Sequence, residues 1–297
     1  MNTPTQNNQI EVRHFVILGI LSIIWGSSFI LMKKALVAFQ PFDLACMRIA
    51  ISALSFLPIL IYHRRKIQWK KWPIHLLVGL TGSGIPAFMY FIAQTNINSM
   101  ISGLLNSLTP IWTLVLGILI FKNKISKYHI SGVVLGFVGA VLLMLFSETS
   151  GANKNLWFGL FIVVGTFCYG ISGNVVKSYL QDIKSLLISS LSFVLIGIPA
   201  IIALVFSDSL WVMEWNIETQ KSLAALIVLS LVGTVMATVL FYKLIQETSA
   251  VFGSSVAYIM PLVAIFWGVL DGEGLGLNVI ISMILILTGV YLIKKES

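Results

Sequence analysis

Ten apolar stretches, each long enough to cross a lipid bilayer as a helix, occupy most of this 297-residue chain. A hydrocarbon core about 30 Å thick needs roughly 20 residues of α-helix. Between Lys71 and Lys122 the chain contains no Asp, Glu, Lys or Arg. A water-soluble fold of this size could not cover so much apolar sequence with a polar shell. The sequence therefore predicts an all-α integral membrane protein.

The apolar stretches alternate with short polar connectors, and this alternation defines ten predicted transmembrane helices. Helices are expected because a spanning segment must satisfy its own backbone hydrogen bonds in lipid. Stretches of about 20 residues also exceed the length of barrel strands. The predicted spans are 14–34, 42–62, 73–95, 100–121, 128–147, 156–177, 185–206, 222–244, 249–270 and 276–293.

Lysine and arginine are distributed unevenly between alternate connectors, and this predicts the orientation of the chain. One set of connectors, which includes both termini, holds 14 of the 19 basic residues; the other set holds 4, and Arg48 lies within a span. Cytoplasmic connectors carry the excess of positive charge in membrane proteins. We therefore expect a multi-pass protein of the cytoplasmic (inner) membrane with both termini, including a short tail at 1–13, in the cytoplasm.

Composition narrows the classes of partner and chemistry. The net charge of +8 arises mainly in the connectors, where it sets topology, so it does not indicate a nucleic-acid partner. Cys46 and Cys168 lie within predicted spans and are expected to pack as small apolar side chains. The sequence has no phosphate-loop motif for ATP and no Cys/His cluster for a metal, and we expect no cofactor.

An enzyme is the main alternative class. The stretch from Gly170 to Gly173 reads G-x-S-G, as around the serine of rhomboid-type intramembrane proteases. Such a serine needs a histidine base on a later helix, and no histidine follows His129. We therefore predict that the protein is not an enzyme. The middle of each predicted span also lacks Asp and Glu, so any ion coupling would use groups at the boundaries, or transport would run as facilitated diffusion or exchange.

Three short motifs recur at nearly the same spacing and predict an internal duplication. The aromatic–Gly–x–Ser motif at Trp25 returns at Tyr169, 144 residues later. A proline expected in the middle of the fourth helix of each half occurs at Pro110 and Pro261, 151 residues apart. A Gly-rich apolar motif at Gly139 returns 150 residues later. We expect two five-helix repeats, at 14–147 and 156–293.

The odd number of helices in each repeat has a mechanical consequence. Five spans return the chain to the opposite side of the membrane, so the second repeat enters upside down. Inverted repeats related by an axis in the membrane plane are a recurring design of secondary carriers. Two similar halves of opposite orientation can adopt outward-open and inward-open packings of comparable energy.

At these residues the chain resembles the EamA-type permeases of the drug/metabolite transporter superfamily. The matching features are the W-G-x-S-F-x-x-x-K stretch from Trp25 to Lys33, Arg48 early in the second helix, the S-x-x-P at Ser107–Pro110, Pro261, and Gly272-Glu273 before the last helix. The chain departs from the family pattern at Asn123, where an acidic residue is often found, and at Tyr169, which replaces Trp. The resemblance implies an exporter of amino acids or other small metabolites.

Polar and aromatic residues within the spans are the candidates for a substrate cavity near the midplane. Their alternative role is close helix packing. Arg48 is the costliest of them, at about 2.5–3.5 kcal/mol for an arginine at mid-membrane, and it either contacts substrate or gate, or reaches outward as a structural group. The cavity candidates are Trp25, Ser28, Arg48, Tyr90, Asn106, Tyr169, Ser172, Asn174, Ser254 and Tyr258.

Two further pairs occupy corresponding places in the halves. Lys33 and Lys177 lie near the ends of helices one and six, where they either reach to the interface or form charged mouths of one cavity. Pro110 and Pro261 are candidates for hinges, with a purely structural bend as the alternative.

The sequence thus predicts a secondary permease of small organic metabolites that works by alternating access, with amino acids or related metabolites exported. An importer or exchanger of nucleosides, sugars or other small solutes is the alternative, and a membrane scaffold is a distant one. The expected partners are a small-molecule substrate and the lipid bilayer, with the chain as a monomer or homodimer.

Overall fold

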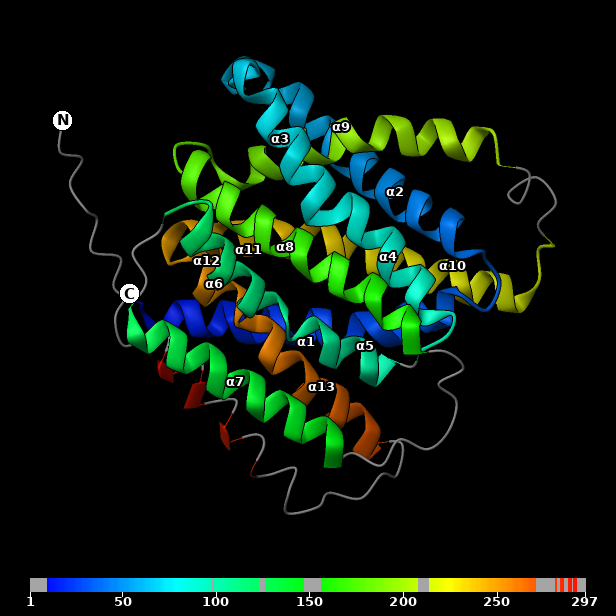
Figure 1. The fold of residues 1–297 in the computed structure, drawn as a ribbon. Helices are drawn as coiled ribbons and strands as arrows, with labels where there is room; N and C mark the ends of the chain where they lie inside the picture. The colour runs from blue at the N-terminus through cyan, green and yellow to red at the C-terminus, as the bar shows by residue number, and fades with distance from the viewer. Residues whose placement is uncertain are drawn as a thin grey trace.

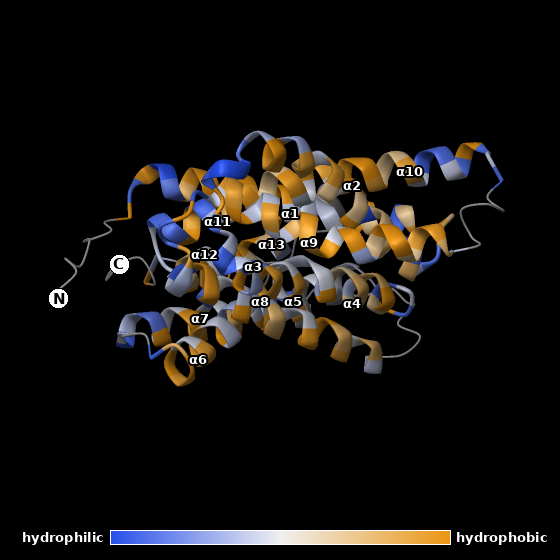
Figure 2. Cartoon of the chain, turned by 90° about the horizontal axis from the view of Figure 1, so that it is seen from above, coloured by the Kyte–Doolittle hydropathy of each residue, from blue (hydrophilic) through white to orange (hydrophobic). Residues whose placement is uncertain are grey.

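The computed structural model describes residues 10–97, 99–122, 126–146, 156–207 and 214–270, with positions 281, 284, 285, 288, 289, 291 and 292. These residues form a bundle of helices that run side by side along one common direction (Figure 1), and none of them lies in a strand. Hydrophilic residues gather at the two ends of the bundle and hydrophobic ones along its length (Figure 2). This is the distribution that a bilayer imposes on spanning helices.

The helical elements follow one another with short connectors. Those of the first half are α1 (Val12–Ala35), α2 (Pro41–Tyr62), η1 (Arg64–Lys66), η2 (Trp69–Lys71), α3 (Trp72–Gly79), η3 (Leu80–Gly84), α4 (Ile85–Gln94), α5 (Ser99–Asn106), α6 (Thr109–Leu119) and α7 (Lys127–Phe146). Those of the second half are η4 (Leu156–Phe158), α8 (Gly159–Tyr179), α9 (Ser185–Val205), α10 (Ile217–Ser230), η6 (Leu231–Met236), α11 (Ala237–Glu247), α12 (Ala250–Ser254) and α13 (Val256–Leu270).

Six helical stretches of the described chain are long and apolar enough to cross a membrane. They are Val12–Ala35, Pro41–Tyr62, Trp69–Gln94, Gly159–Tyr179, Ser185–Val205 and Ile217–Glu247. Shorter apolar helices occur at Thr109–Leu119 and Ala250–Val263. The predicted tenth span, 276–293, lies largely outside the described residues, so the count of ten stays a prediction.

The bundle is apolar on its outer surface and carries hydroxyl groups inside. Leu54, Leu160 and Ile198 lie in the middle or first turns of long helices and are each more than half exposed. In lipid such exposure carries no penalty. Ser190 and Ser230 are fully buried, and each donates its hydroxyl hydrogen bond to the carbonyl four residues earlier. A buried serine in a membrane helix is satisfied in this way by its own helix.

Helix α2 packs along α9, and α3 crosses the same helix. The rings of Phe56 and Phe193 stack at a centroid distance of 5.4 Å between α2 and α9. At the second crossing, a Cβ on Gly79 would lie 2.6 Å from the backbone oxygen of Ser192. Only a glycine allows the two backbones to come so close, because that contact cannot be relieved by turning a side chain.

Two irregular features occur at corresponding places of the two halves. A π-helical segment interrupts the third helix of each half, as η3 from Leu80 and as η6 from Leu231, 151 positions later. The fourth helix of each half is broken, between α5 and α6 and at Ser255 between α12 and α13. The two breaks meet, because the Ser107 hydroxyl donates a 3.3 Å hydrogen bond to the Ala257 carbonyl.

The structure corrects two expectations. Pro110 does not lie in the middle of a helix: it is the second residue of α6, where a proline is tolerated because the first turn leaves its N–H groups unpaired anyway. The helix expected at 222–244 begins earlier, at Ile217, where the Asn216 side chain accepts a hydrogen bond from the Thr219 backbone N–H. Pro261 does lie inside α13, as expected. Asn123, Gly272 and Glu273 of the family pattern, and most of the tail 1–13, lie outside the described residues.

Candidate functional site

A cavity of about 90 Å³ lies in the centre of the bundle and is lined by residues from both halves. Eight of the ten residues expected to line a cavity are found there. They are Trp25, Ser28, Arg48, Tyr90, Asn106, Tyr169, Ser172 and Ser254. The remaining two, Asn174 and Tyr258, do not line it.

The helices that carry these side chains meet through matched contacts at the two π-helical segments. A Cβ on Gly233 of η6 would lie 3.0 Å from the Ser28 hydroxyl of α1. A Cβ on Gly82 of η3 would lie 2.7 Å from the Ser172 hydroxyl of α8. In each case a glycine of one half lets a serine of the other half approach the backbone. The cavity is therefore built where each half inserts its first helix against the third helix of the other.

One wall of the cavity is aromatic and is fixed by hydrogen bonds. The Tyr90 hydroxyl donates to Oδ1 of Asn106, and Nδ2 of Asn106 lies 3.3 Å from the sulfur of Met260. The rings of Tyr90 and Tyr169 lie 5.9 Å apart. Because both polar groups of Asn106 are engaged, its orientation and that of Tyr90 are set before any ligand enters.

A second part of the lining is held by an indole. Nε1 of Trp25 donates a 2.8 Å hydrogen bond to the carbonyl of Gly233, within the π-helical segment η6. Its ring packs edge-on against Phe241 at 5.0 Å. A π-helical turn leaves a carbonyl without its regular helical partner, and the indole N–H satisfies one here. Trp25 thus joins α1 to η6 and α11.

Arg48 extends from α2 toward the same segment. Its Nε donates a 2.8 Å hydrogen bond to the hydroxyl oxygen of Thr234, and that hydroxyl donates to the Leu229 carbonyl at 3.1 Å. The guanidinium is therefore held between α2 and η6 rather than reaching to the end of its own helix. Tyr90 and Tyr169 line the same cavity as the guanidinium.

Five other candidates do not line the cavity. The amide of Asn174 donates to the carbonyls of Thr113 and Gly170, both at 2.9 Å, and joins α8 to α6. The Tyr258 hydroxyl donates to the Val133 carbonyl at 2.8 Å, which joins α13 to α7. Lys33 is exposed at the end of α1. Pro110 and Pro261, the hinge candidates, are buried but do not line the cavity.

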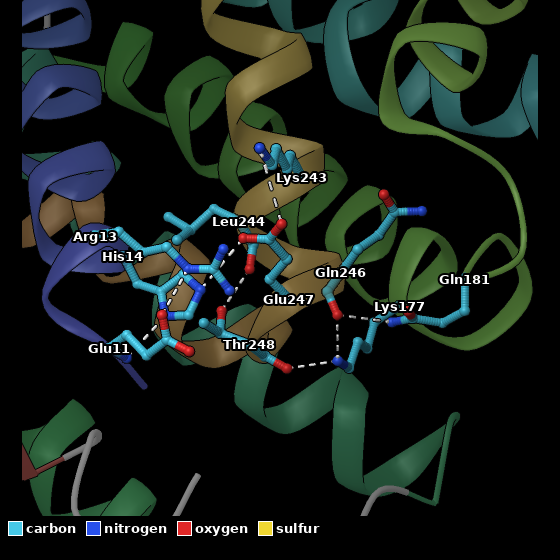
Figure 3. Close-up of polar contacts among 10 residues, drawn as sticks. All are labelled: Glu11, Arg13, His14, Lys177, Gln181, Lys243, Leu244, Gln246, Glu247 and Thr248. Carbon is cyan, nitrogen blue, oxygen red and sulfur yellow. Dashed lines mark hydrogen bonds and ion pairs between the residues drawn. The ribbon is translucent and has the colours of Figure 1, made fainter. Parts of the chain in front are cut away.

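Lys177 belongs to a polar cluster at one end of the bundle (Figure 3). Its Nζ donates to the carbonyls of Gln246 and Thr248, where α11 ends. In return, Nε2 of Gln246 donates to the carbonyls of Leu180 and Ile183, just after α8 ends, both at 2.7 Å. Each helix thus caps the terminal carbonyls of the other. We call the Lys177, Gln246 and Thr248 group the clasp.

A second contact at the same end joins α11 to α1. Nε2 of His14 lies 3.3 Å from Oε2 of Glu247, and Nδ1 of His14 accepts the backbone N–H of Glu11 (Figure 3). Lys71 also lies at this end, where it forms a 2.8 Å ion pair with Asp182 in the connector after α8. Hydrogen bonds from Lys71 and then Gln68 hold the pKa of the Asp182 carboxyl below its usual value, so this contact persists as the pH falls further than it would for an isolated aspartate.

These contacts join connectors that the charge count places on one side of the membrane. The opposite ends of the helices are joined separately, by the hydroxyl of Ser207 to the carboxylate of Asp43 at 2.7 Å and by the hydroxyl of Ser222 to the carbonyl of Lys34 at 2.9 Å. The cavity lies between these two polar ends.

Thr234, Gly82 and Gly233, which shape the cavity, were not among the predicted site residues. A signal for them exists in the sequence: a glycine followed by a hydroxyl residue, Gly82-Ser83 and Gly233-Thr234, stands in the third predicted span of each half at an offset of 151. The clasp residue Gln246 has no counterpart signal, because a glutamine at a helix end is unremarkable in sequence.

The lining suits binding of a small solute. Trp25, Phe29, Phe193 and Phe241 supply apolar surface, while hydroxyl, amide and guanidinium groups supply a few polar contacts. Small-molecule sites in proteins have this composition. Among the described residues, His, Cys, Asp and Glu side chains form no group of three or more that could hold a metal ion.

Comparison with known proteins gives consistent matches along the whole chain. The model of the EamA-like transporter family matches residues 14–145 and again residues 156–294. An uncharacterised transporter of Archaeoglobus fulgidus is 24% identical over 287 residues, which is 96% of this chain and 100% of that protein. The uncharacterised inner membrane transporter YedA of Escherichia coli K12 is 25% identical and covers 95% of this chain and 93% of its own length.

A solved crystal structure has the same fold. It aligns with a TM-score of 0.71 and 14% sequence identity over 95% of this chain and 96% of the other.

Proposed function

The chain belongs to the EamA-like transporter family, and from this premise we propose that it is a secondary permease that moves a small organic metabolite by alternating access. The family match, the relatives named as transporters and the apolar helices make it a multi-pass inner membrane transporter and not an enzyme. Amino acids or related metabolites, moved outward, are the substrate class that the family resemblance favours.

One observation carries this proposal: the central cavity is built from matching elements of both halves. Gly82 against Ser172 and Gly233 against Ser28 are the same contact made twice, once by each half. The π-helical segments and broken fourth helices also recur at corresponding places. These matches support two five-helix repeats, at 14–147 and 156–293, related by an axis in the membrane plane.

The clasp gives the proposed motion a specific requirement. It holds α8 of the second half to the end of α11, close to Ser172 and Tyr242 of the cavity, whose hydroxyl oxygens lie 3.4 Å apart. For solute to pass that end, the hydrogen bonds of Lys177 and Gln246 must break. At the opposite end, the contacts of Asp43 and Lys34 must open instead. Alternating access is the exchange between these two closures.

The proposal is tested by comparing solutes of the medium and the cell between a deletion strain and an overexpressing strain. A transporter shifts at least one solute reciprocally between the two pools. Accumulation in the medium on overexpression supports export, and depletion from the medium identifies an importer or exchanger. A scaffold leaves both pools unaltered, and that result would refute the proposal.

Substitution of the cavity residues should reduce flux without affecting membrane insertion. We expect Trp25→Ala, Asn106→Leu and Tyr169→Ala each to lower the initial transport rate of the identified solute by about tenfold or more. Each substitution removes a side chain that lines the cavity and the contacts which that side chain makes there. Rates are measured at equal amounts of inserted protein. Leu160→Ala, on the lipid-facing surface of the same helix as Tyr169, is the matched control and should leave the rate unchanged. Wild-type flux in all three cavity variants would refute the site.

The predicted topology can be tested by labelling single cysteines. In a background with Cys46 and Cys168 replaced by alanine, Arg64→Cys in η1 and Glu218→Cys in the first turn of α10 place thiols at exposed positions that the charge count assigns to opposite sides of the membrane. A membrane-impermeant maleimide added to intact cells should label residue 218 and not residue 64, with the pattern reversed in inside-out vesicles. Labelling of both from the same side would contradict the inverted arrangement.

A further inference from the structure

The cavity contains a positive charge that no ion pair among the described residues balances. Among the described residues that line it, Arg48 is the only charged one, and the lining includes no Asp or Glu. No ion pair within the described chain involves Arg48. A guanidinium keeps its proton in proteins, so the charge stays in place when the cavity is empty. A buried cation without a partner is costly, and such groups in membrane helices commonly mark a site of function.

The geometry of Arg48 leaves its outer face available. A guanidinium has five N–H donors, and the single hydrogen bond that the described residues give the Arg48 side chain uses Nε, toward Thr234. The two terminal amino groups, Nη1 and Nη2, form the edge that pairs bidentately with a carboxylate or phosphate. The Thr234 hydroxyl is in turn held by its own hydrogen bond to the Leu229 carbonyl of α10. The hydrogen bond of Nε thus orients the side chain. The two terminal amino groups, which we call the fork of Arg48, are left for a ligand.

We propose that the substrate is an organic anion, such as a monocarboxylate, whose negative group binds the fork of Arg48. This inference rests on the proposed transport function and specifies its substrate class. The described lining offers no complementary group for an ammonium ion, because none of its residues carries a carboxylate. A zwitterionic amino acid would bring a second charge that only neutral oxygens and aromatic faces could meet. Related metabolites without a free ammonium group, such as 2-hydroxy acids, satisfy the site better.

The rest of the lining limits the size and character of that anion. The apolar side chains of Phe29, Ile49, Phe193 and Met260 surround the cavity, so the remainder of the substrate should be apolar. A volume of about 90 Å³ holds roughly six to nine water-sized atoms, since each needs about 10–15 Å³ of such space. A branched acid with nine non-hydrogen atoms lies at the upper end of this range.

Leucine and two compounds that each differ from it in one group test the inference. They are 2-hydroxy-4-methylpentanoate, an anion; leucine, a zwitterion; and leucinol, a cation. Binding to the purified full chain is measured as the rise in Tm with concentration, and exchange is measured by counterflow in proteoliposomes. We expect the hydroxy acid to bind about tenfold more tightly than leucine. We expect leucinol to produce no rise in Tm and no counterflow.

Substitutions assign the effect to Arg48. Arg48→Gln should weaken binding of the hydroxy acid by about 10- to 100-fold, the usual effect of losing a charged hydrogen-bond partner. Arg48→Lys, which keeps the charge but not the fork, and Thr234→Val, which removes the orienting hydroxyl, should each fall between Gln and wild type. Arg65→Gln, an exposed arginine of a connector, is the control and should bind as wild type.

Each outcome separates this inference from the transport proposal. Equal or tighter binding of leucine or leucinol, or a hydroxy-acid affinity unchanged in Arg48→Gln, overturns the anion inference while transport itself stands. The anion inference is also overturned if the hydroxy acid produces no response and acetate, lactate and benzoate, tested beside it, produce none either. The transport proposal fails separately, if the strain comparison shows no solute that shifts between cell and medium.

Discussion

Replacing Lys177 with methionine is expected to shift the protein toward a conformation in which the cavity is open at the clasp end. The substitution removes both hydrogen bonds to the carbonyls of Gln246 and Thr248. A hydrogen bond from a charged donor contributes about 1.5–3 kcal/mol, so losing even one shifts a two-state equilibrium by about 10- to 150-fold. The conformation in which these carbonyls are already separated loses nothing. The population therefore moves in its favour.

The shift is measured as reactivity of a cysteine introduced at Ser254, a cavity residue on α12. In inside-out vesicles from the background without native cysteines, a membrane-impermeant maleimide should label it faster when Lys177 is methionine. Gln246→Leu should act in the same direction, because it breaks the reciprocal pair of hydrogen bonds. Lys184→Met, an exposed lysine at the same end, should label as the parent does. Equal labelling rates in Lys177→Met, Gln246→Leu and the parent would show that the clasp does not close the cavity.

Gly79→Ala should cause the largest loss of stability among single-methyl changes in the described helices of the first half. Its Cβ would stand 2.6 Å from the backbone oxygen of Ser192, and neither α3 nor α9 can yield at that point without separating. Overpacking of this kind costs about 1–3 kcal/mol, with higher values where backbone must move. We expect a lower Tm and a lower free energy of unfolding in mixed detergent.

A matched glycine controls for the intrinsic effect of the substitution. Gly19 of α1 has no atom within 4 Å of where a Cβ would stand. Alanine is the better helix former by about 1 kcal/mol, so Gly19→Ala should be neutral or slightly stabilising. If Gly79→Ala and Gly19→Ala both have the Tm and free energy of unfolding of the wild type, the close crossing of α3 and α9 is not a constraint on the fold.

The positions of the long helices could be predicted well because hydropathy and length depend on the bilayer alone. The helix expected at 14–34 is α1, Val12–Ala35, and the one expected at 185–206 is α9, Ser185–Val205. The internal breaks could not be predicted in the same way. Small and polar residues stand at both breaks, at 106–110 and at 253–255, but Ser189, Ser190 and Ser192 stand inside the unbroken helix α9, so a local dip in hydropathy does not mark a break.

The cavity was predictable in composition and less so in membership. Trp25, Tyr169 and Arg48 line it, whereas Asn174 and Tyr258 pack between helices although they are equally polar and equally central. A fully apolar helix has no hydrophobic face that fixes its rotation, so the sequence cannot say which polar group faces inward. Neighbouring helices decide this, and Asn174 turns to the carbonyls of α6 and of its own helix.

The expected equivalence of Lys33 and Lys177 also depends on surroundings that the motif does not contain. Both follow the same aromatic–Gly–x–Ser pattern by eight residues. Lys33 ends exposed at the close of α1, and Lys177 is engaged with the end of α11. A duplicated sequence can keep its fold in both halves while its terminal side chains acquire separate roles.

The π-helical segments restrict which changes in chain length this protein tolerates. Deleting one residue from Leu231–Met236 would let the wide turn relax to regular α-helix, and the change in length would be absorbed there. A deletion in the regular helix α11 before Phe241 has no wide turn to absorb it, so every later side chain would rotate by about 100° about the helix axis. Phe241 and Tyr242 would then leave the cavity together. Changes of one residue should accordingly be confined to the connectors and the π-helical segments, even though a shortened span would still cross the membrane.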